Sequence, residues 1–149
     1  MPWKKHPLVV LETLVLIGVG GYAGSSLRFF VDGFLPGLEG TLLVNVVGSF
    51  ALGFLLYEAM YADLLAGRTH VVLGVGFLSS FTTYSTFVVE AVLTTAPVAL
   101  VYVIASYALG FGAVLVGRSL ARRVGAGVEP DTTGQEDRTT DTAPTEGKR

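Results

Sequence analysis

Four long apolar runs constrain this chain more than any other feature of its sequence. They extend from about Leu8 to Phe30, Thr41 to Tyr61, Val71 to Thr95 and Ala96 to Gly117. A helix needs about 20 apolar residues to cross the hydrocarbon core of a bilayer. The composition agrees, because 51% of the residues are hydrophobic, only 15% are charged and the mean hydropathy is +0.61. The sequence therefore predicts an all-α membrane protein whose subunit crosses the lipid bilayer with four transmembrane helices.

The residues between the runs favour turns. They are Asp32-Gly33 and Pro36-Gly37 at the first junction and Asp63, Gly67 and Arg68 at the second. At the third junction Pro97 suits the first turn of a helix, where its missing N–H is not needed. The run after the N-terminal MPWKKHP is longer than the core of a cleavable signal, so we expect it to remain as the first span.

The chain changes composition near Gly125, after which Gly, Pro, Thr and acidic residues predominate. Such a composition cannot bury a core. We therefore expect a four-span unit at residues 1–124 and a disordered acidic tail at residues 125–149. The net charge of −2 comes from this tail, and the sequence indicates no surface for nucleic acid.

The sequence offers little for catalysis or for a metal site built from side chains. It contains no Cys, and neither His6 nor His70 has a partner at ligand spacing. We find no nucleophile–base pair and no phosphate-binding loop, and the Gly18 to Gly20 stretch lacks the strand–turn–helix context of a dinucleotide site. An enzyme is therefore not expected.

Small residues recur four positions apart in three of the apolar runs. The pairs are Gly20/Gly24, Ser49/Gly53 and Ala113/Gly117. Such pairs let helix backbones approach closely. They serve either packing within one subunit or contacts between subunits, and the sequence leaves both open. Because four short helices cannot enclose a substantial pore alone, an oligomer is one of the two expectations.

The segment from Ser79 to Phe87, SSFTTYSTF, is the least typical part of the third apolar run. Seven of its nine residues carry a hydroxyl. A hydroxyl left unpaired in hydrocarbon costs on the order of 1 to 3 kcal/mol. Ser and Thr can bond back to helical carbonyls, but this bends the helix. Irregular backbone at membrane depth lines cavities and often binds a cation, so we expect a functional role here.

The polar groups of the other spans are neutral donors. Asn45 is either a bridge between helices or a donor for an anion. Helical spacing aligns Thr41 with Asn45 and Ser49, and it aligns Tyr102 with Ser106. Amide and hydroxyl donors, with the positive edges of aromatic rings, suit a small and strongly hydrated anion.

Charged residues are nearly absent from the span interiors. Arg28 is close to the end of the first run, while Glu12, Glu58 and Glu90 lie toward span ends. A pore for large, soft anions would use rings of Arg or Lys. A small four-span proton-coupled drug exporter requires a mid-membrane acid, for which Glu12 is the only and weak candidate. A channel, this exporter and a non-transporting assembly subunit therefore remain as hypotheses.

Several segments resemble the Fluc (CrcB) fluoride-channel family across about Gly18 to Gly117. They are GGYAGSSLRFF from Gly20, GTLLVNVVGSF from Gly40, GFLSSFTTYSTFVVE from Gly76, and the Tyr102/Ser106 pair. The resemblance implies an antiparallel dimer of four-helix subunits whose third helix is broken. It also implies passive fluoride efflux through two narrow pathways, which lowers cytoplasmic fluoride, and one structural sodium ion at the dimer centre.

The resemblance also assigns residues. It places the sodium ion on the backbone carbonyls of Ser79 and Thr82, and it places Arg28 at a vestibule. The implied fluoride pathway has one amide, two aromatic rings and a polar track, which are Asn45, Tyr84, Phe87, Ser85, Thr86, Tyr102 and Ser106. The chain departs from the family where Ser79-Ser80 replaces Gly-Gly and where Tyr84 replaces Phe. The first change keeps the carbonyls but loses the conformational freedom of Gly.

Basic residues near the span ends are distributed unequally. The side that holds both termini carries Lys4, Lys5, Arg68, Arg118, Arg122 and Arg123, whereas the other side carries Arg28. Positive residues near spans stay in the cytoplasm, so we expect a cell-membrane protein with both termini cytoplasmic. A chain that inserts one way cannot form an antiparallel dimer with itself. The expected partner is therefore an oppositely oriented paralogue, with a homodimer as the alternative if the bias is too weak.

Overall fold

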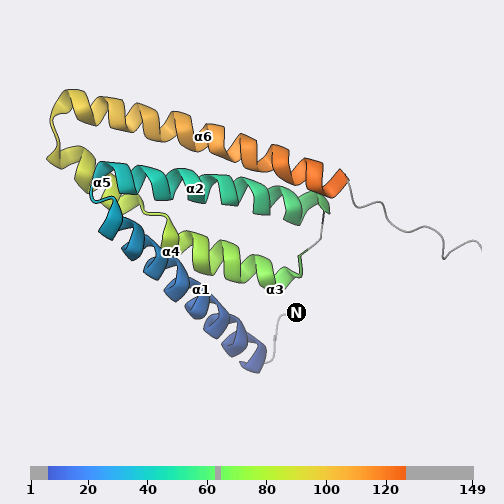
Figure 1. Cartoon of the computed structure of the whole chain (residues 1–149). Coiled ribbons are helices and arrows are strands. Elements are labelled where there is room, and N and C mark those ends of the chain that lie inside the picture. Colours follow the sequence, from blue (N-terminus) through green and yellow to red (C-terminus); the bar gives the residue numbers. More distant parts are fainter. Residues whose placement is uncertain (1–6, 63–64, 127–149) are drawn as a thin grey trace, which may run out of the picture.

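A computed structural model of the chain describes residues 7–62 and 65–126, and within these ranges its regular structure is entirely helical (Figure 1). The elements are α1 (Pro7–Phe34), α2 (Leu38–Tyr57), η1 (Glu58–Ala62), α3 (Gly67–His70), η2 (Val71–Leu78), α4 (Ser79–Phe81), α5 (Tyr84–Leu93) and α6 (Ala96–Ala126). The two η elements have the wider π-helical hydrogen-bonding pattern. Lys4, Lys5, His6, Asp63 and the predicted tail from residue 127 lie outside the described residues.

Four helical units in the described residues are long and apolar enough to cross a membrane. They are Pro7–Phe34, Leu38–Tyr61, Gly67–Leu93 and Ala96–Gly125. The four-span, all-α prediction is confirmed. The boundary between a channel unit and a tail at residue 125 stays a prediction, because nearly all of the tail is outside the described residues.

Two helix ends differ from the expected positions. α1 continues through Asp32-Gly33 to Phe34, so of the two predicted breaks only Pro36-Gly37 is a turn. Gly37 has φ of +82°, a left-handed value that a residue with a Cβ seldom adopts. α6 continues past Gly117 to Ala126, because Leu, Ala and Arg are good helix formers even where the hydropathy falls. The fall in hydropathy after Gly117 therefore does not mark the end of the helix.

Helix packing pairs α2 with α6 and α1 with η2 (Figure 1). A Cβ added at Gly117 would overlap the carbonyl oxygen of Phe50, and one added at Gly24 would overlap the carbonyl oxygen of Phe77. Both glycines are buried and allow the backbones to meet. The small-residue pairs therefore serve packing within the subunit, as one of the two predicted roles requires.

The third span is broken, as predicted. Its first part is η2 and α4, and its second part is α5. Between them Thr82 (ψ 155°) and Thr83 (φ −145°, ψ 124°) have extended backbone. The π-helical geometry of Val71–Leu78 was not predicted, because periodicity does not distinguish it from an α-helix over so short a length.

Candidate ion pathway

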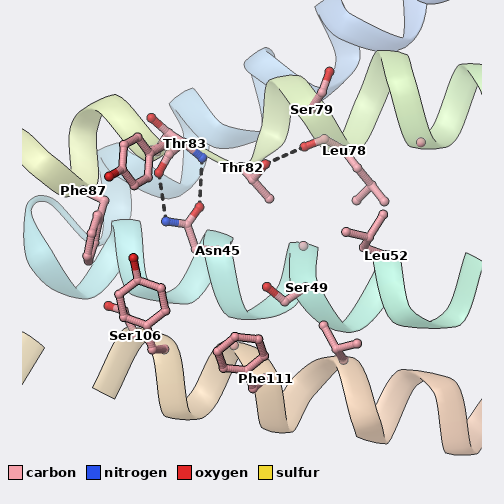
Figure 2. Close-up of a pocket in the computed structure, with 16 residues that line it drawn as sticks. Asn45, Ser49, Leu52, Leu78, Ser79, Thr82, Thr83, Phe87, Ser106 and Phe111 are labelled. Atoms are coloured by element: carbon pink, nitrogen blue, oxygen red, sulfur yellow. Dashed lines mark hydrogen bonds between the residues drawn. The ribbon is translucent and has the colours of Figure 1, made fainter. Parts of the chain in front are cut away.

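A cavity of about 470 Å³ lies beside the break in the third span (Figure 2). α2, the broken span and α6 form its walls. None of the 16 lining residues is charged. Its polar and aromatic lining consists of Asn45, Ser49, Ser79, Thr82, Thr83, Ser106, Tyr84, Phe87, Tyr107 and Phe111. The cavity therefore offers neutral hydrogen-bonding groups and ring edges.

Asn45 connects α2 to the break. Its Nδ2 donates to the Thr83 carbonyl at 2.9 Å, and its Oδ1 accepts from the Thr83 N–H at 2.8 Å, as the dashed lines in Figure 2 show. The amide thus makes the paired hydrogen bonds that a neighbouring strand would make to an extended residue. Of its predicted roles, the bridge between helices is present in the structure. One amide N–H remains for another acceptor.

Thr83 begins α5 as its N-cap residue. Its Oγ1 accepts from the Thr86 N–H at 3.3 Å and donates to Thr86 Oγ1 at 3.0 Å. An N-cap hydroxyl replaces the helical acceptor that a break removes. Sequence reasoning did not select Thr83 as a site residue. The signal was present, because a Thr just before a resumed helix is a typical start signal.

The Ser79 hydroxyl bonds within its own helix. It donates to the Val75 carbonyl one turn earlier. Thr82 behaves in the same way, since its Oγ1 donates to the Leu78 carbonyl at 2.9 Å. Both side chains are therefore satisfied locally, and their backbone carbonyls are the groups left for a ligand.

Aromatic rings surround one side of the cavity. Phe87 is buried, and its ring centroid lies 6.0 Å from that of Tyr84, 5.1 Å from that of Tyr102 and 6.3 Å from that of Tyr107. The Tyr107 ring meets Phe87 edge to face at 84°. Tyr84 is 72% exposed, so its hydroxyl is not confined by this subunit.

The predicted polar track is only partly assembled around the cavity. Ser106 lines it, and within residues 7–62 and 65–126 its Oγ is a buried atom without a hydrogen-bond partner. Tyr102 is outside the lining, and its hydroxyl donates to Glu90 at 3.1 Å. Ser85 and Thr86 also lie outside the lining.

The structure therefore brings together six of the sequence-predicted positions: Asn45, Ser79, Thr82, Tyr84, Phe87 and Ser106. Thr86 and Tyr102 adjoin this group through Thr83 and Phe87 respectively. Arg28 lies on α1, which contributes nothing to the lining. Its predicted vestibule role remains a prediction.

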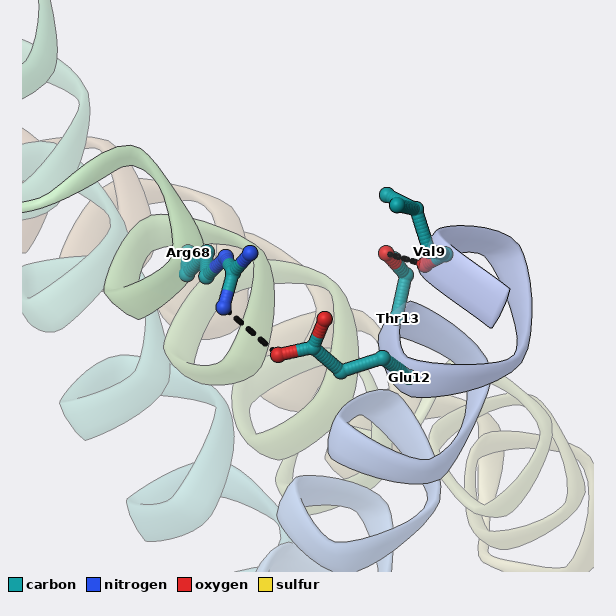
Figure 3. A network of polar contacts seen from close by, with 4 residues as sticks. All are labelled: Val9, Glu12, Thr13 and Arg68. Atoms are coloured by element: carbon teal, nitrogen blue, oxygen red, sulfur yellow. Dashed lines mark hydrogen bonds and ion pairs between the residues drawn. The ribbon is translucent and has the colours of Figure 1, made fainter. Parts of the chain in front are cut away.

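Glu12, the acid on which an exporter would depend, forms an ion pair. Arg68 Nη1 lies 2.5 Å from Glu12 Oε1, between α1 and α3 (Figure 3). Both side chains are substantially exposed, Glu12 at 46% and Arg68 at 70%. On the next residue, Thr13 Oγ1 donates back to the Val9 carbonyl at 2.8 Å. Glu12 is thus a paired surface carboxylate rather than a group facing the cavity.

A buried acid lies at the same junction. Glu58 is 2% exposed, its Oε1 accepts from the Leu65 N–H at 2.6 Å, and its Oε2 contacts Nε2 of His70. Arg68 and His70 both belong to α3, so this one turn is linked to α1 on one side and to η1 on the other. The junction between the second and third spans is therefore held by polar contacts.

The fold and the cavity define a small helical membrane protein with a broken span at a polar, uncharged site. A family model described as CrcB-like protein, Camphor Resistance (CrcB), matches residues 15–118. The chain belongs to this family, whose named relatives are ion channels and not enzymes.

Individual relatives are similar over most of their length. A protein of Haloarcula marismortui named fluoride-specific ion channel FluC 1 is 59% identical over 122 residues, which are 82% of this chain and 95% of the relative. A Halobacterium salinarum protein named fluoride-specific ion channel FluC 2 is 47% identical over 74% of this chain and 87% of its own. A Natronomonas pharaonis FluC 1 is 43% identical over 74% and 95%.

Proposed function

We propose that this chain is a subunit of a fluoride-specific channel that lets fluoride leave the cell passively and so lowers cytoplasmic fluoride. The observation that carries the proposal is the similarity to proteins named fluoride-specific ion channels, which reaches 59% identity over 82% of the chain. The uncharged cavity supports it. No coupling ion is required, because fluoride moves down its own gradient.

The lining chemistry suits fluoride. Fluoride is small and strongly hydrated, so a pathway must replace its water with other donors. The free N–H of Asn45 and the unpaired hydroxyl of Ser106 are such donors, and a buried hydroxyl without an acceptor gains most from an incoming anion. The ring edges of Tyr84 and Phe87 add weaker positive potential.

The proposed pathway residues that do not line the cavity have roles beyond it. Ser85, Thr86 and Tyr102 continue the polar track, and Tyr102 takes part by exchanging its present acceptor, Glu90, for fluoride. Arg28 attracts anions to a vestibule at the end of α1. The Tyr84 side chain is exposed, and its hydroxyl either binds fluoride or narrows its path.

We also propose that the carbonyls of Ser79 and Thr82 hold one sodium ion at the centre of an antiparallel dimer. Their side chains are bonded within the helix, so carbonyl oxygens are the ligands this site offers, and a hard cation prefers oxygen. When bound, the ion supplies a fixed positive charge and is not transported. Retained ²²Na⁺ without transmembrane sodium movement tests this assignment.

The partner in this dimer is an oppositely oriented paralogue. Arg118, Arg122 and Arg123 are exposed at the end of α6, and Arg68 is at the same end of the molecule, as Figure 1 shows for α3 and α6. This distribution supports insertion into the cell membrane with both termini cytoplasmic. Equal cytoplasmic and external signals from C-terminal reporter fusions would instead support a homodimer.

Fluoride release from loaded liposomes tests the function. The purified chain is reconstituted with any paralogous partner, and release is followed with a fluoride electrode. Release without a proton gradient is expected, while no release, or release that demands a proton gradient, rejects a channel. The proton-coupled exporter is less well supported, because its acid, Glu12, is paired with Arg68.

A further inference from the structure

Two backbone N–H groups at the break are diverted from their helical acceptors. In a continuous helix the N–H of residue 83 donates to the carbonyl of residue 79. Here the Thr83 N–H donates to Asn45 Oδ1 at 2.8 Å. The Ser79 carbonyl therefore loses the donor that the helix would have given it, and a side chain from α2 takes that donor.

The same exchange occurs one turn later. In a continuous helix the N–H of residue 86 donates to the carbonyl of residue 82. Here the Thr86 N–H donates to Thr83 Oγ1 at 3.3 Å, and the Thr82 carbonyl leaves the helical direction because its ψ is 155°. A second carbonyl thus lacks its helical donor, and a side chain again accepts that N–H.

We propose that Asn45 and Thr83 are positioning residues that expose the Ser79 and Thr82 carbonyls to a small hard cation. This inference rests on the proposed sodium site and deepens it, since it says which side chains create the ligands. Ser79 and Thr82, the two proposed ligands, are the residues whose helical donors are occupied by these two side chains. The side chains do not touch the cation, and they act by occupying the N–H groups that would otherwise close the helix.

Asn45 also stabilises the extended backbone of the break through a second hydrogen bond. Its Nδ2 donates to the Thr83 carbonyl at 2.9 Å, so the amide is fixed on both sides of one extended residue. Thr83 is buried, which limits the access of water to these groups. The cation and the two side chains therefore stabilise the same broken conformation, and loss of either side chain should weaken cation binding.

A matched pair of variants at position 83 tests this inference. Thr83→Val keeps the shape and the preference for extended backbone but removes the acceptor, whereas Thr83→Ser keeps the acceptor. Thermal unfolding of the full-length channel is measured against sodium concentration, with N-methyl-D-glucamine as the replacement cation. We expect the sodium midpoint to rise about tenfold in Thr83→Val, as loss of an N-cap bond implies, and to change little in Thr83→Ser.

The outcomes are distinguishable from those for the channel itself. Equal sodium midpoints for the natural chain and Thr83→Val overturn the positioning role while leaving the sodium site in place. A natural chain that shows no sodium dependence, yet releases fluoride, overturns both the sodium assignment and this inference but not the channel.

A second pair of variants keeps the test decisive if Thr83→Val is not recovered folded. Asn45→Ala removes the acceptor for the Thr83 N–H, whereas Ser49→Ala, on the same face of α2, leaves it in place. We expect sodium binding to weaken about tenfold in Asn45→Ala and to change little in Ser49→Ala. Equal sodium binding in Asn45→Ala and the natural chain contradicts the inference.

Discussion

The α2–α6 pair and the third span differ in how the hydrogen-bonding groups of their backbones are satisfied. In the first, the helices remain continuous, and glycines let one backbone contact the other without a side chain between them. In the second, the helix stops at Thr82 and Thr83, and side chains take over the hydrogen bonds that the backbone gives up.

The two regions therefore have different roles: the α2–α6 pair stabilises the fold, and the break in the third span forms the candidate site. Close backbone packing needs the absence of side chains and tolerates little change in volume. The break requires particular hydrogen-bond donors and acceptors, and the cavity lies beside it. Substitutions in the first region should therefore affect folding, and those in the second should affect ion binding and flux.

The largest effect is expected for Asn45→Ala. This change removes both hydrogen bonds to Thr83 and the donor left for fluoride. Hydrogen bonds to a charged group contribute about 1.5 to 3 kcal/mol, so flux should fall about tenfold to hundredfold in the liposome assay. Ser49→Ala, on the same face of α2 and lining the same cavity, is the control and should retain most flux. Natural rates in Asn45→Ala would show that the break does not depend on this amide.

Gly117→Ala should destabilise the α2–α6 pair, because its Cβ would overlap the Phe50 carbonyl. The control is Gly112→Ala on the same helix, where an added Cβ meets nothing within 4 Å. Both changes gain about 1 kcal/mol in helix propensity, so their difference isolates the overlap, which we expect to be about 1 to 3 kcal/mol.

Unfolding in denaturant, with flux measured in parallel, gives this difference. Equal stabilities for the two glycine variants would mean that α2 and α6 can move apart without cost. The claim that close packing of α2 against α6 stabilises the fold would then be wrong.

Phe87→Ile should reduce flux by about tenfold, a smaller effect than that of Asn45→Ala, because the ring contributes edges rather than a hydrogen bond. Phe87 is buried among Tyr84, Tyr102 and Tyr107. Phe111→Ile is the control, since Phe111 also lines the cavity but is 70% exposed. If both variants conduct alike, the ring pair at Tyr84 and Phe87 does not form the pathway.

The smallest effect is expected for Glu12→Gln. An exposed ion pair contributes about 0.2 to 1 kcal/mol, so removing the carboxylate from Arg68 should change the unfolding free energy only slightly. Fluoride release should remain within about fivefold of the natural rate by the same energy scale. Loss of transport in this variant would favour the proton-coupled exporter.

The sequence was sufficient for the spans and for the existence of the break. Apolar length sets the number of crossings, and the hydroxyl-rich segment marks the irregular backbone. It was not sufficient for the partners of Asn45. Those depend on how α2 lies against the third span, and hydropathy along one chain carries no information about that register. Thr83 was not selected, although its place just before a resumed helix is a local start signal.

Helix ends and the polar track show the same limit. α1 continues through Asp32-Gly33 to Phe34, although both residues favour turns. Tyr102 was aligned with Ser106 by spacing, but its hydroxyl is bonded to Glu90 on a neighbouring helix. The direction of a side chain on one helix follows from periodicity, whereas its partner on another helix does not.

The π-helical segment η2 leads directly into the break at Ser79. Its beginning is joined to α3, and Val72 and Phe77, near its two ends, lie close to Gly20 and Gly24 of α1. A π-helix holds more residues in each turn than an α-helix. Deleting one residue from Val71–Leu78 would let the segment return to α-helical winding, and the following residues would keep nearly the same direction, because the wider turns are what accommodate the extra residue. The segment can therefore lose one residue and still direct the break toward Asn45.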